Sequence, residues 1–232
     1  DGSGIAILRG PNRRRLSTEQ VVPMLNVDIG KWEDLSEKLA KECPNAKFER
    51  VVLIDDFTAS GTTFIREVDG VWKGKLHTFN KMVRDAQKQL GDAFPIAQGF
   101  HLHVHHYVSS FQARAALRER VDDARARWSE AWFDEVTITE GLLLPETLKL
   151  TPGQDAEMLD LCDRYYDNAL YLRLKKHCDE AGQSDMKLGY ANCALPIVLD
   201  HNTPNNSIPL LWAETTGGDG VHSMRPLFHR RD

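Results

Sequence analysis

Two neighbouring carboxylates followed by a loop of small residues are the groups in this sequence best suited to chemistry. Asp55 and Asp56 come directly after the apolar residues 51–54, and the small residues 59–63 follow shortly. A loop rich in Gly, Ser and Thr that enters a helix presents backbone N–H groups and a positive dipole end to a phosphate. Paired carboxylates suit hydroxyl groups or a metal ion instead. The combination therefore predicts a site for a ribose 5-phosphate.

The element that must position these groups is the apolar run before them. Four consecutive apolar residues, three of them β-branched, predict a central strand buried on both faces of a sheet. In an open α/β sheet, ligands bind beyond the carboxyl ends of the strands, which is where this loop lies. The alternative is an ordinary buried strand that ends in an Asp-rich turn. Against it, carboxylates buried without a partner are costly.

Residues 51–63 resemble the motif by which type I phosphoribosyltransferases bind 5-phosphoribosyl 1-pyrophosphate (PRPP). That motif has four apolar residues, two acids and a Thr/Ser/Gly loop, and every class is present here. The resemblance implies that Asp55 and Asp56 hold the ribose 2- and 3-hydroxyls. It implies a 5-phosphate loop made of Thr58, Ala59, Ser60, Gly61, Thr62 and Thr63. It also implies Mg²⁺ as cofactor, bound through PRPP rather than by protein side chains alone.

The first residues of the chain lie where this family places a pyrophosphate-binding loop. Asp1, Gly2, Ser3 and Gly4 are the candidates, because the glycines let the backbone approach a pyrophosphate closely. A frayed terminus explains the same residues equally well. Since the chain begins with Asp rather than Met, we expect that a preceding N-terminal part is missing.

A polar loop near the C-terminus is the second candidate site. His201, Asn202, Asn205 and Asn206 offer donors and acceptors that suit a base or a sugar. Residues 200–212 resemble a signature of divergent phosphoribosyltransferase-like proteins from bacterial conflict and defence gene clusters. The alternative is a turn of Asn and Pro residues that caps a strand.

Three alternating histidines raise the question of a metal site. His101, His103 and His105 share one face of a predicted strand. Same-face neighbours on a strand lie nearly 7 Å apart, whereas the ligands of one metal ion converge to within about 4 Å of one another. Hydrogen bonding or packing is therefore the preferred interpretation, and a metalloprotein is a weaker hypothesis.

Composition excludes several classes of protein. The chain has 232 residues, 41% apolar and 27% charged, and a net charge of −5. These values are typical of a soluble globular protein without a global basic field for nucleic acid. We find no apolar run of membrane-spanning length and no signal peptide. Four cysteines without CxxC spacing favour reduced thiols in the cytoplasm.

Alternating strand and helix patterns predict an α/β fold, a mainly parallel sheet with helices on both faces, in three layers like a phosphoribosyltransferase. Expected helices cover residues 31–42, 76–90, 109–132 and 154–178, the last broken near Asn168, and a short helix interrupted by Gly70 and Gly74 follows Thr63. Further strands are expected at residues 95–108, 134–139 and 194–199. We expect one domain over residues 1–214, then a linker and basic tail over residues 215–232.

Two functions follow from the resemblance. The first is a phosphoribosyltransferase that moves phosphoribosyl from PRPP to an unknown acceptor and releases pyrophosphate. The second is a catalytically weak sensor of PRPP or a nucleotide, acting as an effector or regulatory subunit of a bacterial antiphage defence complex. The expected partners are PRPP or a nucleotide and a protein or nucleoprotein of such a system, without a membrane, and a homodimer is left open. Whether the chain is an active enzyme is also left open, because no mobile catalytic loop and no base-selecting hood is recognised.

Overall fold

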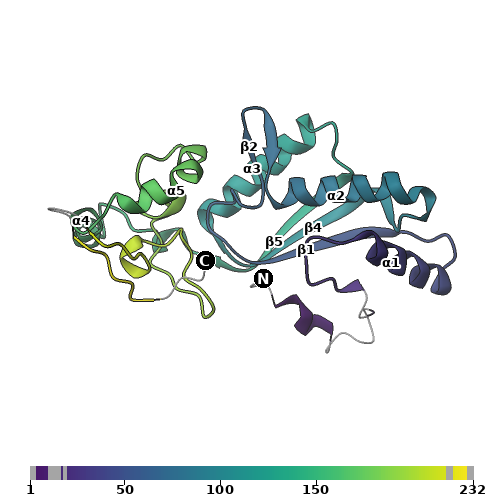
Figure 1. The fold of residues 1–232 in the computed structure, drawn as a ribbon, viewed down its shortest axis with the longest axis horizontal. Helices are drawn as coiled ribbons and strands as arrows, with labels where there is room; N and C mark the ends of the chain where they lie inside the picture. The colour runs from purple at the N-terminus through teal and green to yellow at the C-terminus, as the bar shows by residue number, and fades with distance from the viewer. Residues whose placement is uncertain (1–3, 10–16, 18–19, 218–221, 229–232) are drawn as a thin grey trace. The chain divides into compact units, whose positions relative to one another are not determined.

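The structure is a computed structural model that describes residues 4–9, 17, 20–217 and 222–228 (Figure 1). The chain forms two compact units, described separately below: unit 1 is Asp1–Ser109 with Arg114–Leu143, and unit 2 is Ser110–Ala113 with Leu144–Asp232. No helix in the described ranges is both long and apolar enough to span a bilayer. The elements follow in the order η1 (Ile5–Arg9), α1 (Ile29–Glu42), β1 (Phe48–Thr58), β2 (Arg66–Val68), β3 (Val71–Lys73), α2 (Lys75–Leu90), η3 (Gly91–Ala93), β4 (Ile96–Ser110), α3 (Phe111–Arg127), β5 (Phe133–Leu144), η4 (Glu146–Leu148), α4 (Ala156–Arg164), α5 (Ala169–Glu180), η5 (Tyr190–Asn192) and η6 (Pro209–Leu211).

A three-stranded parallel sheet in the order β1-β4-β5 is the centre of unit 1. β1 and β4 pair in parallel, with Asp55 opposite His106. β4 and β5 are also parallel. The side chain of His101 bonds that of Thr137, and His103, two residues further along β4, bonds Thr139, two residues further along β5. The expected α/β class, a parallel sheet flanked by helices, is confirmed.

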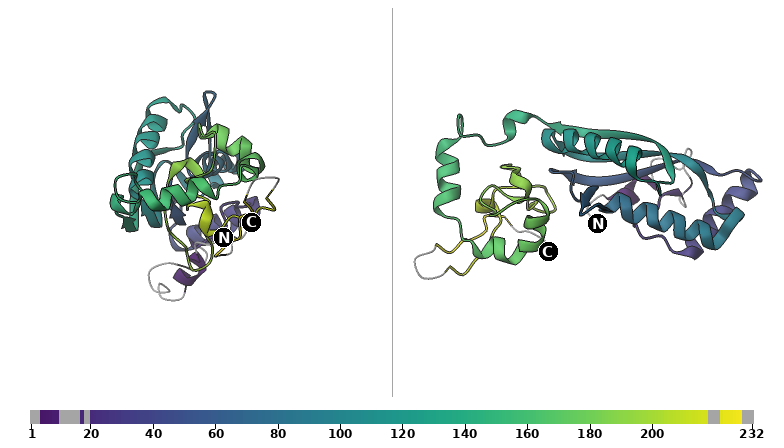
Figure 2. Two further views of the ribbon diagram at one scale, coloured as in Figure 1. Left: turned by 90° about the vertical axis from the view of Figure 1, so that its left-hand side faces the viewer. Right: turned by 90° about the horizontal axis from the view of Figure 1, so that it is seen from above.

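Helical periodicity explains which side chains cover the sheet. α1, α2 and α3 each bury apolar side chains at spacings of three and four residues, and these meet the even-numbered residues of β4 in one core. Figure 1 shows α2 and α3 on the same side of the strands, and Figure 2 shows them again from above. The main members of this core are Trp32 and Leu35 from α1, Leu76, Phe79 and Val83 from α2, Leu117, Val121 and Ala124 from α3, and Phe100, Leu102 and Val104 from β4.

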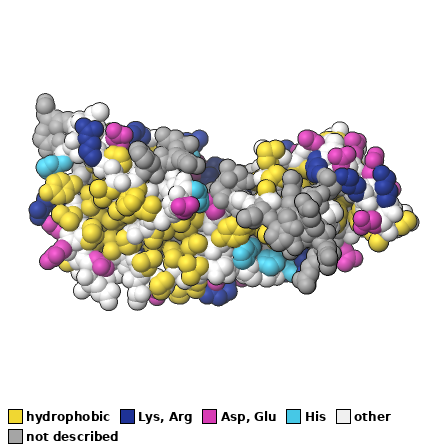
Figure 3. Space-filling view, turned by 90° about the horizontal axis from the view of Figure 1, so that it is seen from below, with side chains coloured by type: hydrophobic (Ala, Val, Ile, Leu, Met, Phe, Trp, Pro, Cys, Tyr) yellow, Lys and Arg dark blue, Asp and Glu magenta, His cyan; other side chains and the backbone are white. Residues whose placement is uncertain are grey.

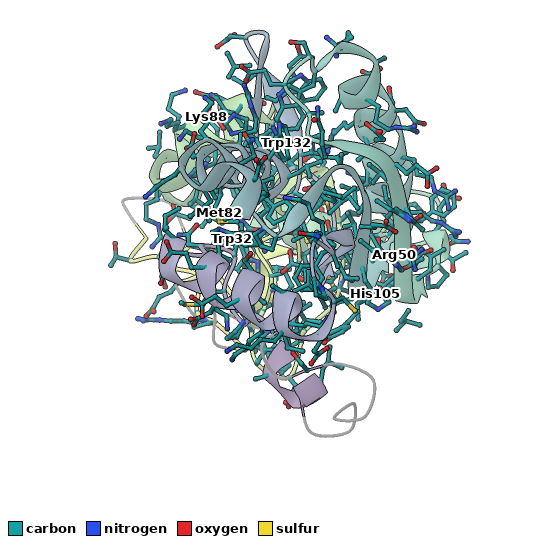
Figure 4. All side chains as sticks on the ribbon, turned by 90° about the vertical axis from the view of Figure 1, so that its right-hand side faces the viewer. Trp32, Arg50, Met82, Lys88, His105 and Trp132 are labelled. Carbon is teal, nitrogen blue, oxygen red and sulfur yellow. The ribbon has the colours of Figure 1, made fainter. Side chains whose placement is uncertain are left out.

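The other face of the sheet carries polar side chains, including three histidines. The odd-numbered residues His101, His103 and His105 of β4 are half-buried there, beside exposed Arg50 of β1. Figure 3, which views the side away from α2 and α3, shows histidine side chains at the surface. In Figure 4, Arg50 and His105 lie together on one side, and the core residue Trp32 on the other.

Two expectations for the region around β1 are wrong. β1 is the first strand in the order rather than a central one, and Val52 is 45% exposed instead of buried. The short helix expected after Thr63 is instead the antiparallel hairpin of β2 and β3. Asp69 and Gly70 form its tip, both with positive φ, as a two-residue Asp-Gly hairpin turn requires.

Unit 2 contains the two short helices α4 and α5, so the expected break near Asn168 is confirmed. The strand expected over residues 194–199 is wrong, because Leu195 and Leu199 make only isolated bridges. Thr215 N donates to Met224 O, and Met224 is buried in the core of unit 2. Thr215 and Met224 therefore pack within unit 2.

Candidate functional site

The paired acids lie near the C-terminal end of β1, and one of them forms an ion pair. Asp55 Oδ2 accepts a hydrogen bond from Lys75 Nζ at 2.6 Å. Burial raises the pKa of Asp55 above its ordinary value; Lys75 opposes this shift and the adjacent Asp56 adds to it. Asp56 Oδ1 accepts from the backbone N–H of Phe57 at 2.9 Å. Asp55 is therefore a half-buried carboxyl with its own cation, ready to bind polar hydrogens.

The small-residue loop after β1 is a compact turn in which the carbonyl groups of Ser60, Gly61 and Thr62 have protein donors. Ser60 O accepts from Arg120 Nη1 at 2.9 Å, and Thr62 O accepts from Arg66 Nη1 at 3.0 Å. Gly61 O accepts from the backbone N–H groups of residues 64 and 65 at 3.2 and 3.1 Å. With these three oxygens satisfied from within the protein, none of them needs to face an incoming anion.

The loop is also largely buried. Thr58, Ala59, Ser60, Gly61 and Thr62 are buried, and Thr63 is the exposed member of the predicted set. The hydroxyls of Ser60 and Thr62 lie 2.8 Å apart and bond each other. An anion would therefore meet this loop from the side of Thr63.

The helix expected directly after the loop is reached only after the hairpin, yet it still touches the loop. Lys75 N donates to Thr63 O and Leu76 N donates to Phe64 O, both at 3.0 Å. Gly74, with φ +106°, makes this return possible, since a Cβ there would lie 2.6 Å from Phe64 O. The positive end of the α2 dipole consequently lies against the loop.

A pocket of about 260 Å³ adjoins the ion pair. Its polar lining is Asp55 and Lys75, and the remaining walls are apolar. The apolar walls come from the N-terminal segment, β1, the start of the hairpin connection and β4: Ile5, Val22, Pro23, Leu25, Val52, Leu53, Ile54, Phe64 and Val104. The pocket lies wholly within unit 1.

A buried histidine, His106, lies next to Asp55 on the neighbouring strand β4. His106 pairs with Asp55 across the β1-β4 ladder and is 1% exposed, and its ring meets that of Phe64 at 5.7 Å. Burial, with the nearby positive charge of Lys75, lowers the pKa of His106 to about 4. Its Nε2 has no hydrogen-bond partner among the described residues. His106 is therefore a neutral imidazole at physiological pH.

Sequence reasoning missed three residues at this site. No local signal indicates that Lys75 and Arg120 reach β1 and its loop, since both contacts join residues distant along the chain. His106 did carry a signal, because it continues the even-numbered series of β4 residues that face the core. The three neighbouring histidines drew attention to the other face.

The second polar loop lies in unit 2 and is used in packing. Asn206 Nδ2 donates to Tyr190 O at 3.1 Å and to Cys193 Sγ at 3.4 Å, and Tyr190 N donates to Asn205 O. His201 and Asn202 are half-buried beside it. This loop therefore shapes its own unit, while Asp55, Asp56 and the loop after them belong to unit 1.

The remaining candidates give a mixed outcome. Asp1, Gly2 and Ser3 lie outside the described residues, and Gly4 is exposed with φ +55°. Within the described part of the chain, no cluster of three or more His, Cys, Asp or Glu side chains could hold a metal ion. The three alternating histidines instead bond threonine hydroxyls of β5 at 2.7–2.8 Å. Hydrogen bonding to β5 is therefore the role that the described contacts give these three histidines.

Removing the Arg120 guanidinium tests how the loop is held. We expect Arg120→Ala to lower the free energy of unfolding by about 1–3 kcal/mol, because Ser60 O loses a donor in a buried turn. The exposed Arg118 on the same helix supplies the control, and Arg118→Ala should stay within about 0.5 kcal/mol of wild type. Urea denaturation measures both, and equal effects would show that Arg120 does not support the loop.

A parallel sheet, paired acids at the end of β1 and a tight glycine turn define a protein of phosphoribosyltransferase-like class. The PRTase-CE family matches residues 14–230, and the chain belongs to this phosphoribosyltransferase-like family. No curated protein and no solved structure matches the chain.

Proposed function

We propose that the chain binds PRPP or a ribonucleotide at Asp55, Asp56 and the loop over residues 58–63, and transfers phosphoribosyl to an acceptor. Family membership and the adjacency of the acids to a loop with internally satisfied carbonyls support this proposal. The observation that carries it is that Asp55, paired with Lys75, lines a pocket rather than pointing into open solvent.

The proposed transfer needs no covalent bond between the protein and the substrate. The bond between ribose C1 and pyrophosphate breaks with its electron pair leaving on pyrophosphate, and the acceptor's lone pair forms the new bond to C1. Asp55 and Asp56 would fix the sugar hydroxyls and stabilise the positive charge that develops on the ring.

Mg²⁺ fits this site only as a companion of the substrate. Magnesium is usually held by one or two carboxylates plus substrate phosphates and waters. Asp55 already binds Lys75, and no cluster of three or more His, Cys, Asp or Glu ligands exists in the described ranges, so the substrate's phosphates would hold most of the ion's coordination. When bound, Mg²⁺ would neutralise charge on the pyrophosphate.

A sensor with little turnover is the second candidate. The Lys75–Asp55 ion pair and the burial of the loop favour it, because both must open before a sugar phosphate binds. In that role the chain would be an effector or regulatory subunit of a bacterial antiphage defence complex in the cytoplasm. Separately, within unit 2, we propose the polar loop with His201, Asn202, Asn205 and Asn206 as a contact for a base or sugar.

Calorimetric titration with PRPP and Mg²⁺, with pyrophosphate release assayed in parallel, separates the two candidates. Binding with release supports the transferase, and binding without release supports the sensor. The double variant Asp55→Asn/Asp56→Asn should weaken binding at least 100-fold. The control Asp85→Asn/Asp123→Asn removes two exposed carboxylates and should bind as wild type. Unchanged affinity in the first variant would rule out the site.

A further inference from the structure

Lys75 is bonded to both parts of the proposed site. Its side-chain Nζ donates to Asp55 Oδ2 at 2.6 Å, and its backbone N–H donates to Thr63 O, at the end of the small-residue loop, at 3.0 Å. The residue is the first of α2, where the positive end of the helix dipole lies. One residue therefore contacts the acid assigned to the sugar and the loop assigned to the phosphate.

The ion pair covers Asp55 on its solvent side. The Lys75 side chain is 42% exposed and the Asp55 side chain 17%, so the lysine is the outer partner. Burial raises the pKa of Asp55, and the charge and hydrogen bond of Lys75 counteract that rise, which favours the ionised carboxylate. A hydroxyl that approaches Asp55 consequently meets the lysine first and competes with it for the carboxylate.

The lysine can be drawn away from this position by a stronger anion. Its ammonium is a compact charge with three donors on a flexible four-carbon stem. A phosphate monoester carries a charge of about −1.5 to −2 and three acceptor oxygens, whereas a carboxylate carries a single charge. A phosphate that reaches the Thr63 end of the loop is therefore a better acceptor for this ammonium than Asp55.

We propose that Lys75 is an autoinhibitory latch, a side chain that closes Asp55 in the ligand-free protein and is released by an anionic group of the ligand. Release of Lys75 frees the carboxylate for a hydroxyl of the same ligand. A neutral sugar offers the ammonium no replacement for Asp55, so the latch excludes it. This inference rests on the proposed function and assigns the residue that controls access to its site.

Ribose and ribose 5-phosphate are the probes for the latch, because both carry the sugar hydroxyls and only the second carries an anion. NMR titrations measure their affinities for wild type and for Lys75→Met. We expect Lys75→Met to bind ribose 5-phosphate at least 10-fold more weakly, and ribose at least 3-fold more tightly, than wild type. The control Lys81→Met removes a lysine of the exposed ion pair with Asp85 on the same helix and should change neither affinity.

Opposite changes for the two probes distinguish a latch from a structural role, which would weaken both. Ribose affinity in Lys75→Met that is equal to or weaker than that of wild type would overturn the proposal. Unchanged affinity for ribose 5-phosphate would also overturn it.

The second variant, Asp55→Asn, tests the latch from the other partner with inorganic phosphate as probe. Loss of the carboxylate releases the ammonium, so phosphate should bind at least 5-fold more tightly than to wild type. Asp56→Asn removes the same charge from the neighbouring residue and should tighten phosphate binding by less. Equal tightening in the two variants, or none in Asp55→Asn, would show that Asp55 does not restrain Lys75.

Titration of wild type with PRPP and Mg²⁺ separates failure of the latch from failure of the proposed function. PRPP binding, together with weaker ribose binding in Lys75→Met, would overturn the latch and leave the proposed function standing. A wild type that does not bind PRPP would overturn the proposed function, and phosphate binding to Asp55→Asn would still decide whether Asp55 restrains Lys75.

Discussion

Replacing Gly74 by alanine should lower the free energy of unfolding by about 3–5 kcal/mol, the sum of backbone strain and a steric clash. Gly74 has φ +106° and ψ −176°, a conformation almost confined to glycine. An alanine Cβ would also lie 2.6 Å from Phe64 O and 2.9 Å from Thr63 O, and backbone atoms cannot move aside cheaply. Chemical denaturation with a fixed m-value measures the loss.

Gly70, at the tip of the same hairpin, is the matched control. It also has positive φ, +76°, but a Cβ there would meet nothing within 4 Å. Gly70→Ala should therefore lower the free energy of unfolding only by the strain of a left-handed backbone conformation at alanine, about 1–2 kcal/mol. If the two substitutions destabilise equally, the contact between the start of α2 and the loop is not what makes Gly74 necessary.

Acidification should destabilise the protein through His106. The folded-state pKa of about 4 lies below the ordinary value of 6.5, so between these values the unfolded chain binds a proton that the folded chain does not. The unfolding free energy therefore falls as pH drops from about 7 to about 4 and levels off below. The shift corresponds to about 3 kcal/mol for this single group.

The variant His106→Leu isolates this effect. It removes the titrating imidazole. The difference in unfolding free energy between wild type and variant should therefore be constant above pH 7 and should change by up to about 3 kcal/mol between pH 7 and pH 4. Asp55 acts in the opposite sense, because its raised pKa makes the folded state bind protons more readily as pH falls. That contribution is present in both proteins and cancels in the difference. Parallel profiles would mean that His106 is charged or solvated in the folded state.

The sequence predicted elements whose patterns are local. α1, α2 and β4 lie within two residues of their expected bounds, because their apolar spacing and the Pro or Gly that ends them are read along the chain. The edge position of β1 was not predictable in this way, since it depends on which strands pair. The β2-β3 hairpin did have a local signal, the Asp-Gly pair at its tip, which was read as a helix interruption.

The residues of the candidate site also separate into those that local sequence predicts and those that only tertiary packing brings together. Asp55, Asp56 and the glycine turn are adjacent in sequence, so their proximity follows from chain connectivity. Lys75 joins them only because the hairpin returns the chain to the loop, and Arg120 joins them from α3. Contacts of this kind depend on tertiary packing, which residue types and spacing do not encode locally.

The hairpin separates the loop from α2 in sequence while leaving the two in contact. Both strands are held at their middle pair, Glu67 and Trp72, because Arg127 pairs with Glu67 and lies over the ring of Trp72 at 5.2 Å. At the turn, a Cβ on Gly70 would meet no other atom within 4 Å, and both turn residues are exposed. A peptide tag or fluorophore inserted at this turn is therefore expected to leave the geometry of the neighbouring site intact.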